Sequence, residues 1–314
     1  MELISCGRII KGVGGLYHVK LFACAALPQG FDRNTPVACR AKGAFRHENL
    51  TPLVGDIVSL EIDASGECMI SDITERKSAL IRPPLAHLDL MFVTFAAAKP
   101  APVLETVDKL IFILEHHHIT PVIVVTKHDT KPDYAEQLCA LYRAAGFDAF
   151  CTGSKDGTGI DALRAYVREN CEGKISAFAG ASGVGKSTLL NALFPALELQ
   201  TSEISRKIER GRHTTRTVEL FPMPGTENGY IADTPGFSML DFARFNFFTK
   251  EDLPLTMREF APHLGNCRFT KCSHTKEQGC AILEAVKRGE IAKSRHDSFV
   301  AIYDVLKNKH DWDN

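Results

Sequence analysis

A phosphate-binding loop, GASGVGKST at residues 180–188, constrains the fold of this chain more than any other feature. It fits the pattern G-x-x-x-x-G-K-[ST] and lies between a strand-like run, KISAFAG, and a helix-like run, STLLNALF. Glycines let backbone N–H groups wrap around phosphate oxygens, and the helix N-terminus adds its dipole. The stretch therefore predicts a strand–loop–helix unit that binds the phosphates of a nucleotide.

The residues of this loop have expected roles. Lys186 is expected to neutralise the β and γ phosphates, and the Ser187 hydroxyl is expected to ligate Mg²⁺. With the full pattern in this context, a glycine-rich turn without a ligand is the weaker interpretation. The residues predicted to line the phosphates are Gly180, Ala181, Ser182, Gly183, Val184, Gly185, Lys186, Ser187 and Thr188.

Two candidate guanine-binding loops precede the phosphate loop. TKHD at 126–129 follows the apolar run PVIVV, and Asp129 can accept hydrogen bonds from the N1–H and 2-amino groups of guanine. CTGSKDGTG at 151–159 follows the next predicted strand, and the Ser154 backbone N–H is expected to meet the guanine O6. Ligands gather at the carboxyl ends of parallel strands, so the two loops support each other. The residues predicted to contact the base are Thr126, Lys127, His128, Asp129, Ser154 and Lys155.

DTPG at 233–236 is predicted to sense the third phosphate as switch II. It follows a predicted strand, so Asp233 is expected to hold Mg²⁺ through water and the Gly236 N–H to meet the γ-phosphate. Phe237 stands where many GTPases place a glutamine that orients water. Phenylalanine cannot orient water, so another group must do so, or turnover will be slow.

GRHTTRT at 211–217 lies between the phosphate loop and DTPG and is the candidate switch I. Thr215, favoured over Thr214, is expected to close over Mg²⁺ and the γ-phosphate. His213 is either a residue that positions water or an ordinary exposed histidine. The basic residues around it form either a patch for RNA phosphates or a solvated loop. These residues are Arg206, Lys207, Arg210, Arg212 and Arg216.

The order of these motifs is a circular permutation of the order in ordinary GTPases, because the guanine-binding loops come first. Domain termini often lie close together, so such a rearrangement can leave the sheet intact. The second switch then leads straight into the C-terminal part of the chain. We therefore predict that the nucleotide state moves that part.

A chain of 314 residues is long enough for two or three domains. Residues 1–72 have short strand-like runs between glycine-rich turns, which predicts a small β-barrel, with an SH3-like barrel as the alternative. Strands and helices alternate from about residue 86 to 237, which predicts a largely parallel sheet in a permuted GTPase domain over 73–240, so the chain is expected to be a multidomain α/β protein. Residues 74–84, near the start of that domain, have the composition of a linker. Residues 241–314 are predicted to form a small helical domain.

The charge and hydropathy exclude some classes of protein. The net charge of −1 excludes a polybasic nucleic-acid binder, so any RNA contact would use a local patch. No apolar run reaches the roughly 18 residues of a membrane span, and the first residues lack the apolar core of a signal peptide. The chain is therefore expected to be cytoplasmic.

Three of the ten cysteines gather with a histidine near the C-terminus. Together they supply three thiolates and one imidazole, a closed set that suits tetrahedral Zn²⁺ and leaves no open position. One structural Zn²⁺ is therefore predicted, bound by Cys267, Cys272, His274 and Cys280. The other cysteines are expected to be buried thiols. They are Cys6, Cys24, Cys39, Cys68, Cys139, Cys151 and Cys171.

Together these motifs resemble one family, the circularly permuted GTPases of the RsgA (YjeQ) type, which act on the bacterial small ribosomal subunit. The resemblance covers essentially the whole chain through the barrel, ERK…LIRPP, TKHD, GASGVGKST, GRHTT, DTPGF and the Cys-Cys-His-Cys set. It implies an OB-fold N-terminal domain, a permuted GTPase domain and a zinc-bearing C-terminal domain. It also implies GTP hydrolysis stimulated by the small (30S) subunit, a role in its late maturation, and binding to ribosomal RNA. The chain is expected to act as a monomer.

Two positions depart from the family pattern. Thr126 stands in place of the usual asparagine of the guanine-binding loop, and the hypothesis is a lower nucleotide affinity. Gly153-Ser154-Lys155 replaces Ser-Ala-Lys, a change that is expected to be mild because the key contact is a backbone N–H. Phe237 agrees with the family, which also carries an apolar residue there.

Two other functions stay open at this stage. One is a P-loop ATPase or small-molecule kinase, against which Asp129 argues. The other is a protein that binds GTP but scarcely hydrolyses it, which Phe237 favours for the isolated chain.

Overall fold

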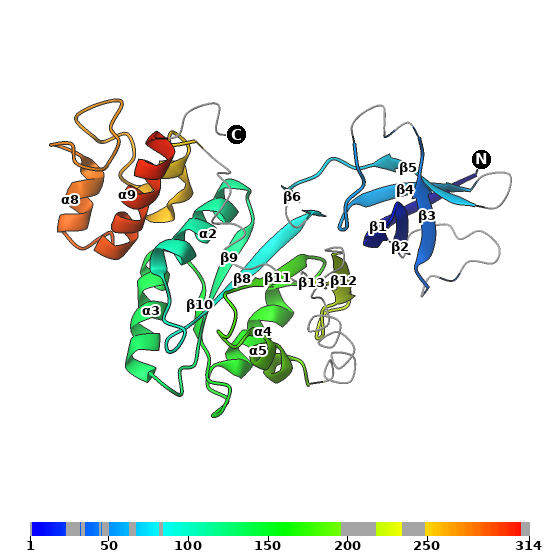
Figure 1. Ribbon diagram of the computed structural model, residues 1–314, viewed down its shortest axis with the longest axis horizontal. Coiled ribbons are helices and arrows are strands. Elements are labelled where there is room, and N and C mark those ends of the chain that lie inside the picture. Colours follow the sequence, from blue (N-terminus) through cyan, green and yellow to red (C-terminus); the bar gives the residue numbers. More distant parts are fainter. Residues whose placement is uncertain are drawn as a thin grey trace. The chain divides into compact units, whose positions relative to one another are not determined.

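The computed structural model divides into two compact units, which are shown together in Figure 1. Unit 1 spans residues 1–89, 167–177 and 197–236, and unit 2 spans 90–166, 178–196 and 237–314. The structure describes residues 2–22, 32, 35–43, 45, 50–62, 67–81, 84–195, 218–233 and 249–308.

Five strands of unit 1 close into a barrel. They are β1 (Glu2–Val13), β2 (Leu16–Leu21), β3 (Val37–Ala41), β4 (Ile57–Ile62) and β5 (Cys68–Ile73). Their order is β1-β2-β3-β5-β4, and β1 also pairs with β4, which closes the sheet. Alternate side chains of each strand point inward, so Ile9, Val58 and Ile70 are fully buried. The predicted N-terminal barrel is confirmed, and it is a five-stranded barrel of the OB type.

The stretch 74–84, which has the composition of a linker, is structured in part. β6 (Ala79–Ile81) pairs antiparallel with β7 (Pro84–Ala86). Just before β6, Arg76 donates two hydrogen bonds of 2.7 Å to the fully buried carboxylate of Asp56. Such a bidentate pair fixes both position and orientation, so this stretch is attached firmly to the barrel.

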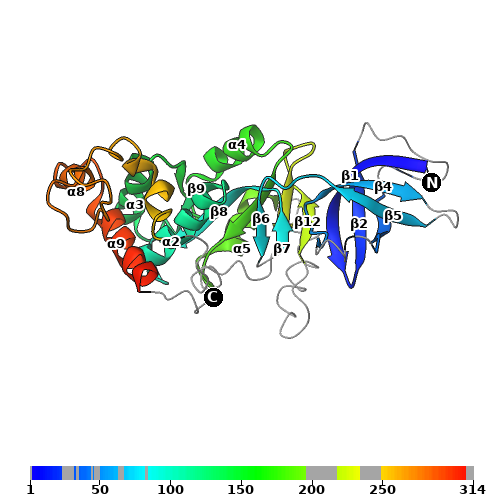
Figure 2. The same ribbon diagram turned by 90° about the horizontal axis from the view of Figure 1, so that it is seen from above.

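The barrel continues, strand to strand, into three further strands of unit 1, as Figure 2 shows for β1 and β12. β12 (Glu219–Pro222) pairs antiparallel with β1 and with β13 (Tyr230–Asp233). β13 runs parallel to β11 (Ile175–Ala179), the strand that leads into the phosphate loop.

Unit 2 contains a parallel sheet with its helices. β8 (Leu88–Ala96), β9 (Thr120–Thr126) and β10 (Ala149–Cys151) lie in the order β10-β9-β8. Nearly every residue of β8 and β9 is buried, as in parallel strands covered on both faces. The connecting helices are α2 (Leu104–His116), α3 (Pro132–Ala144) and α4 (Ile160–Asn170), and α5 (Lys186–Leu193) follows the phosphate loop. The predicted alternation of strands and helices is confirmed.

The described C-terminal segment is helical and belongs to the same unit. It contains the 3-10 helices η2 (Leu253–Thr256) and η3 (Arg258–Phe260), and the α-helices α8 (Ala281–Lys287) and α9 (Lys293–Lys307). Figure 1 shows α9 beside α2. The predicted movement of this segment with nucleotide state stays a prediction, since residues 234–248, which lead into it, lie outside the described ranges.

A buried ion network joins this segment to α2 and α3. Arg295 of α9 is fully buried and donates to Asp108 of α2 at 2.6 Å and to Glu259 of η3 at 2.8 Å. The Tyr142 hydroxyl of α3 donates to the same Asp108 oxygen at 3.0 Å. Burial, reinforced by the Asp108 charge, raises the pKa of Tyr142 and keeps it a donor. Removing one partner from a buried ion pair costs about 3–5 kcal/mol. The two carboxylates on Arg295 therefore hold α9 in its position against α2 and η3.

None of the helices within the described ranges is long and apolar enough to cross a membrane.

Candidate functional site

The phosphate loop occupies the turn between β11 and the N-terminus of α5. Gly185 caps α5 with φ of +101°, a conformation that side chains rarely adopt, which explains the glycine there. Lys186 donates from Nζ to the carbonyl oxygens of Gly180 and Ala181. Burial lowers the pKa of Lys186, so an anion beside its ammonium group would be favourable. Ser187 is exposed in the first turn of α5, as its predicted role requires.

The first guanine-binding loop contacts the phosphate loop directly. Thr126, the last residue of β9, is buried, and its Oγ1 donates to the Val184 carbonyl oxygen at 2.6 Å. Lys127 has a positive φ of 61°, and its Nζ donates to the Gly183 carbonyl oxygen at 2.8 Å. Two motifs about 55 residues apart in sequence are therefore joined by side-chain-to-backbone hydrogen bonds. The Thr126 hydroxyl acts on the phosphate loop, a role that the sequence did not indicate.

Replacing Thr126 with valine is expected to weaken GDP binding by about tenfold. Valine keeps the shape but leaves the buried Val184 carbonyl without its donor, which costs about 1–3 kcal/mol. Titration calorimetry with GDP measures the effect, and Thr126→Ser, which keeps the hydroxyl, is the matched control. Equal affinity of the valine variant and the unchanged protein would show that this hydrogen bond does not support the site.

The second guanine-binding loop lies against the first. The backbone N–H of His128 donates to the Thr152 carbonyl oxygen at 3.1 Å, and Lys155 Nζ lies 3.9 Å from Asp129 Oδ2. The Asp129 side chain is only 14% exposed, whereas that of Lys155 is 86% exposed. Asp129 is therefore held in a nearly enclosed position, while most of the Lys155 side chain is exposed to solvent.

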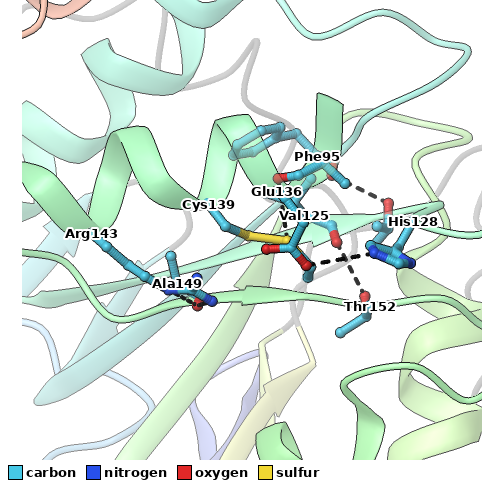
Figure 3. Close-up of a disulfide and its surroundings, with 11 residues drawn as sticks. Phe95, Val125, His128, Glu136, Cys139, Arg143, Ala149 and Thr152 are labelled. Atoms are coloured by element: carbon cyan, nitrogen blue, oxygen red, sulfur yellow. Dashed lines mark hydrogen bonds and ion pairs between the residues drawn. A yellow bond between two sulfur atoms is a disulfide. The ribbon is translucent and has the colours of Figure 1, made fainter. Parts of the chain in front are cut away.

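The His128 side chain faces Glu136 of α3. Its Nε2 lies 3.5 Å from Glu136 Oε1, a contact that Figure 3 marks with a dashed line. The predicted base contact of His128 therefore rests on its backbone rather than on its imidazole.

Asp156 lies in the second predicted guanine-binding loop and was not among the residues predicted from the sequence. Its carboxylate accepts a hydrogen bond from the Thr158 N–H at 3.1 Å, and a Cβ at Gly153 would come within 2.2 Å of Asp156 Oδ1. The hydrogen bond lowers the pKa of Asp156, so the group stays ionised. The Asp156 carboxylate thus occupies the space in which a Cβ at position 153 would lie, and it would have to turn away to admit one.

The predicted switch residues are described only in part. Asp233 ends β13, where its backbone pairs with Glu219, and nothing of its side chain is described. His213, Thr215 and Gly236 lie outside the described residues.

The expectation that the scattered cysteines are buried thiols is wrong for some of them. Cys139 of α3 and Cys151 of β10 form a disulfide (Figure 3), and their Cα atoms are 6.4 Å apart. Cys6 is a free thiol but is exposed. The free and buried thiols are Cys39, Cys68 and Cys171, and Cys24 lies outside the described ranges. Spacing along the chain does not reveal that α3 packs beside β10, so the pairing was not visible in the sequence.

The four predicted zinc ligands come together in the C-terminal segment. The ligand atoms of Cys267, Cys272, His274 and Cys280 all lie within 4.8 Å of one another, and the group could hold a metal ion. The Sγ atoms of Cys267 and Cys280 are 3.9 Å apart, and His274 Nδ1 is 3.5 Å from each. Tetrahedral zinc with Zn–S bonds of about 2.3 Å requires sulfurs about 3.8 Å apart. The spacing of these donor atoms therefore fits the tetrahedral coordination of one zinc ion.

The protonation of these groups also suits a cation. Burial raises the pKa of Cys272 to about 12 and raises that of Cys280, so the thiolate forms need a nearby positive charge. Burial lowers the pKa of His274, which favours the neutral imidazole that binds metals.

Further hydrogen bonds position the ligand loop. His296 of α9 donates from Nε2 to the His274 carbonyl oxygen at 2.8 Å. Glu277 accepts hydrogen bonds from the N–H groups of Ser273, Thr275 and Lys276. Burial opposes ionisation of Glu277, yet the hydrogen bonds from Ser273 and Lys276 lower its pKa to about 2. The loop is thus held by groups outside the ligand set.

Comparison with known proteins gives two family matches. Residues 73–243 match the family described as RsgA GTPase, and residues 6–70 match the family described as RsgA N-terminal domain. A protein of Caldanaerobacter subterraneus subsp. tengcongensis named small ribosomal subunit biogenesis GTPase RsgA is 39% identical over 310 residues, which is 98% of each chain. The protein of the same name from Bacillus subtilis is 37% identical over 96% of this chain and 98% of its own.

Two solved structures have the same fold. YjeQ from Thermotoga maritima has a TM-score of 0.79 at 29% identity, over 98% of this chain and 99% of its own. YloQ, described as a circularly permuted GTPase, has a TM-score of 0.74 at 33% identity, over 98% of this chain and 96% of its own.

Proposed function

The chain belongs to the RsgA family of circularly permuted GTPases and is a GTP hydrolase, and from this premise we propose that it acts in late maturation of the small (30S) ribosomal subunit. The observation that carries the proposal is that relatives named small ribosomal subunit biogenesis GTPase RsgA align with 98% of their own length. The similarity therefore includes the barrel and the metal-binding segment as well as the GTPase core.

Guanine recognition is assigned to the two loops that precede the phosphate loop. Asp129 accepts from the N1–H and 2-amino groups of guanine, and its enclosed carboxylate supports this role. The Ser154 backbone N–H meets the guanine O6, and Lys155 covers the base. Lys127, which is bonded to the phosphate loop, packs its alkyl chain along the base. Adenine offers no matching pair of donors, so the site prefers GTP over ATP.

Phosphate binding is assigned to residues 180–188. The backbone N–H groups of the loop and the Lys186 ammonium hold the β and γ phosphates and stabilise the charge that develops on them. Mg²⁺, when bound, neutralises phosphate charge. The oxygen donors Ser187, Thr215 and Asp233 are suited to hold it, because hard cations prefer hydroxyl and carboxylate oxygens.

The attacking water lacks a glutamine to orient it, since Phe237 follows DTPG. We assign this task to His213, assisted by groups of the ribosomal partner. Hydrolysis by the isolated chain is then slow, and binding of the small subunit and its rRNA stimulates it. The chain works as a monomer in the cytoplasm, where small subunits are assembled.

The metal of the C-terminal cluster is assigned as one structural Zn²⁺. Three thiolates and one neutral imidazole are typical zinc donors, and four protein ligands leave no position for a substrate. The fit of the sulfur spacing to a tetrahedral site supports this assignment.

Purified small subunits are expected to raise the rate of GTP hydrolysis on the order of 100-fold, the scale that a group positioning water contributes. The measurement is single-turnover hydrolysis by the chain alone, with small subunits and with large subunits as the control. Stimulation by both subunits, or by neither, would contradict the proposed role and leave a GTPase with an unknown partner.

A further inference from the structure

We propose that the N-terminal barrel holds the two switch strands, with Lys11 as a positioning residue for GTP hydrolysis. The inference rests on the proposed function only in taking 211–217 and 233–236 as the switches. β12, which follows the first segment in the chain, and β13, which ends at the first residue of the second, belong to unit 1 together with the barrel. The loops assigned to the base and the phosphates, at 126–129, 152–156 and 180–188, belong to unit 2.

The first connection runs through β1 and β12. β1 is 12 residues long; its C-terminal part pairs with β2 on one side and reaches β12 through the pair Lys11↔Glu219. Lys11 Nζ lies 2.7 Å from Glu219 Oε2, and both side chains are about two-thirds buried, with 32% and 30% exposed. Glu219 is the first residue of β12 and follows the end of the first switch segment by two residues. This ion pair therefore attaches the first residue of β12 to the barrel, close to the end of that segment in the sequence.

The second connection runs from β1 to β13. The Arg8 guanidinium lies 5.7 Å from the centre of the Tyr230 ring, and Arg8 is only 9% exposed. Among the described residues, its Nε and Nη1 atoms are buried without a hydrogen-bond partner, so its charge faces the Tyr230 ring and the Asp89 carboxylate. Tyr230 begins β13, and Asp233 ends it as the first residue of the second switch segment. A shift of β1 relative to the sheet would therefore change the contacts of both β12 and β13.

The consequence is a reciprocal coupling. If a partner that binds the barrel changes the affinity of the switch strands for one nucleotide state, that nucleotide state must change the affinity of the barrel for the partner by the same free energy. The effect of the nucleotide state on the barrel can be measured without ribosomes. It concerns β1, which lies in the barrel and carries none of the residues assigned to the nucleotide.

Hydrogen exchange of the β1 amides, compared between GDP and a nonhydrolysable GTP analogue, tests the coupling. We expect the exchange rates near Lys11 to differ about fivefold between the two states, the lower end of usual coupling. Lys11→Glu and Glu219→Lys should each remove this difference, and the double variant, which restores an opposite-charge pair, should recover it. Affinity for GDP should stay unchanged in all three, whereas a general loss of folding would lower it.

The matched control is the pair Lys42–Glu61. It joins the same barrel with similar exposure, 31% and 21%, and its ion pair lies within the barrel, between Lys42 after β3 and Glu61 of β4. Lys42→Glu and Glu61→Lys should leave the nucleotide-dependent difference in β1 intact.

The outcomes separate this inference from the proposed function. Identical exchange of β1 in the two nucleotide states, or a double variant that does not recover the difference, would overturn the coupling. Single-turnover hydrolysis with small subunits, on the same variants, adds a second readout. Loss of stimulation in Lys11→Glu with rescue in the double variant supports the inference. If the unchanged protein is not stimulated at all, the proposed ribosomal role fails, while the exchange experiment still decides the coupling.

Discussion

Replacing Cys280 with serine is expected to abolish zinc binding by the C-terminal cluster and unfold much of the C-terminal segment. Cys280 is 1% exposed and precedes the first residue of α8, so it links the metal site to a helix start. A serine hydroxyl does not ionise as a thiol does and is a poor zinc ligand. Structural zinc contributes about 10–16 kcal/mol of apparent binding free energy, as much as the whole stability of many domains.

The loss should spread beyond the ligand loop. The Phe260 ring lies 6.2 Å from that of His274 and 5.0 Å from that of Phe299, so the metal loop packs on the small core under α9. Arg295 on the same helix makes the buried bonds to Asp108 and Glu259. Loosening α9 would therefore also weaken the attachment of this segment to α2.

Metal analysis and thermal unfolding measure both effects. The unchanged protein should carry about one equivalent of zinc, and the variant close to none. Cys171→Ser is the control, because it changes a buried free thiol that belongs to unit 1. Less than half an equivalent in the unchanged protein, or a full equivalent in Cys280→Ser, would contradict a structural zinc site.

Replacing Asp129 with asparagine is expected to lower the affinity for GTP by about 10²- to 10⁴-fold, because two hydrogen bonds to a charged acceptor are lost at about 1.5–3 kcal/mol each. The asparagine amide would also point an N–H toward the 2-amino group of guanine, donor against donor. Xanthine carries a carbonyl in place of the 2-amino group, so the variant should gain affinity for xanthosine triphosphate. The enclosed position of Asp129 makes water a poor substitute for the lost contacts.

Binding and hydrolysis of GTP, ATP and xanthosine triphosphate measure this change in specificity. Asp133→Asn, the same substitution in the first turn of α3, is the control and should leave all three unchanged. If Asp129→Asn leaves the preference between GTP and ATP as it was, the assignment of TKHD as the guanine-binding loop is wrong. An ATPase or small-molecule kinase would then regain support.

The sequence by itself determined the parts of this protein whose chemistry is local. GASGVGKST indicates its own turn and helix start, because glycines and a following helix are all that a phosphate loop needs. The four metal ligands are spaced within one short loop, so their meeting required no knowledge of the rest of the fold. Strand-like runs between glycine-rich turns likewise predicted the barrel, and the alternation of strand-like and helix-like runs predicted the α/β core.

Only the tertiary structure decided which distant groups meet. Thr126 resembled a weakened guanine contact in the sequence, and the fold places its hydroxyl on the Val184 carbonyl of the phosphate loop. Gly153 resembled a mild substitution, and the fold shows the Asp156 carboxylate against it. The contact of Lys11 with Glu219, 208 residues apart, was visible in no motif. Such contacts depend on how strands and helices pack against one another. The sequence of a single segment does not show which other segment it will pack against.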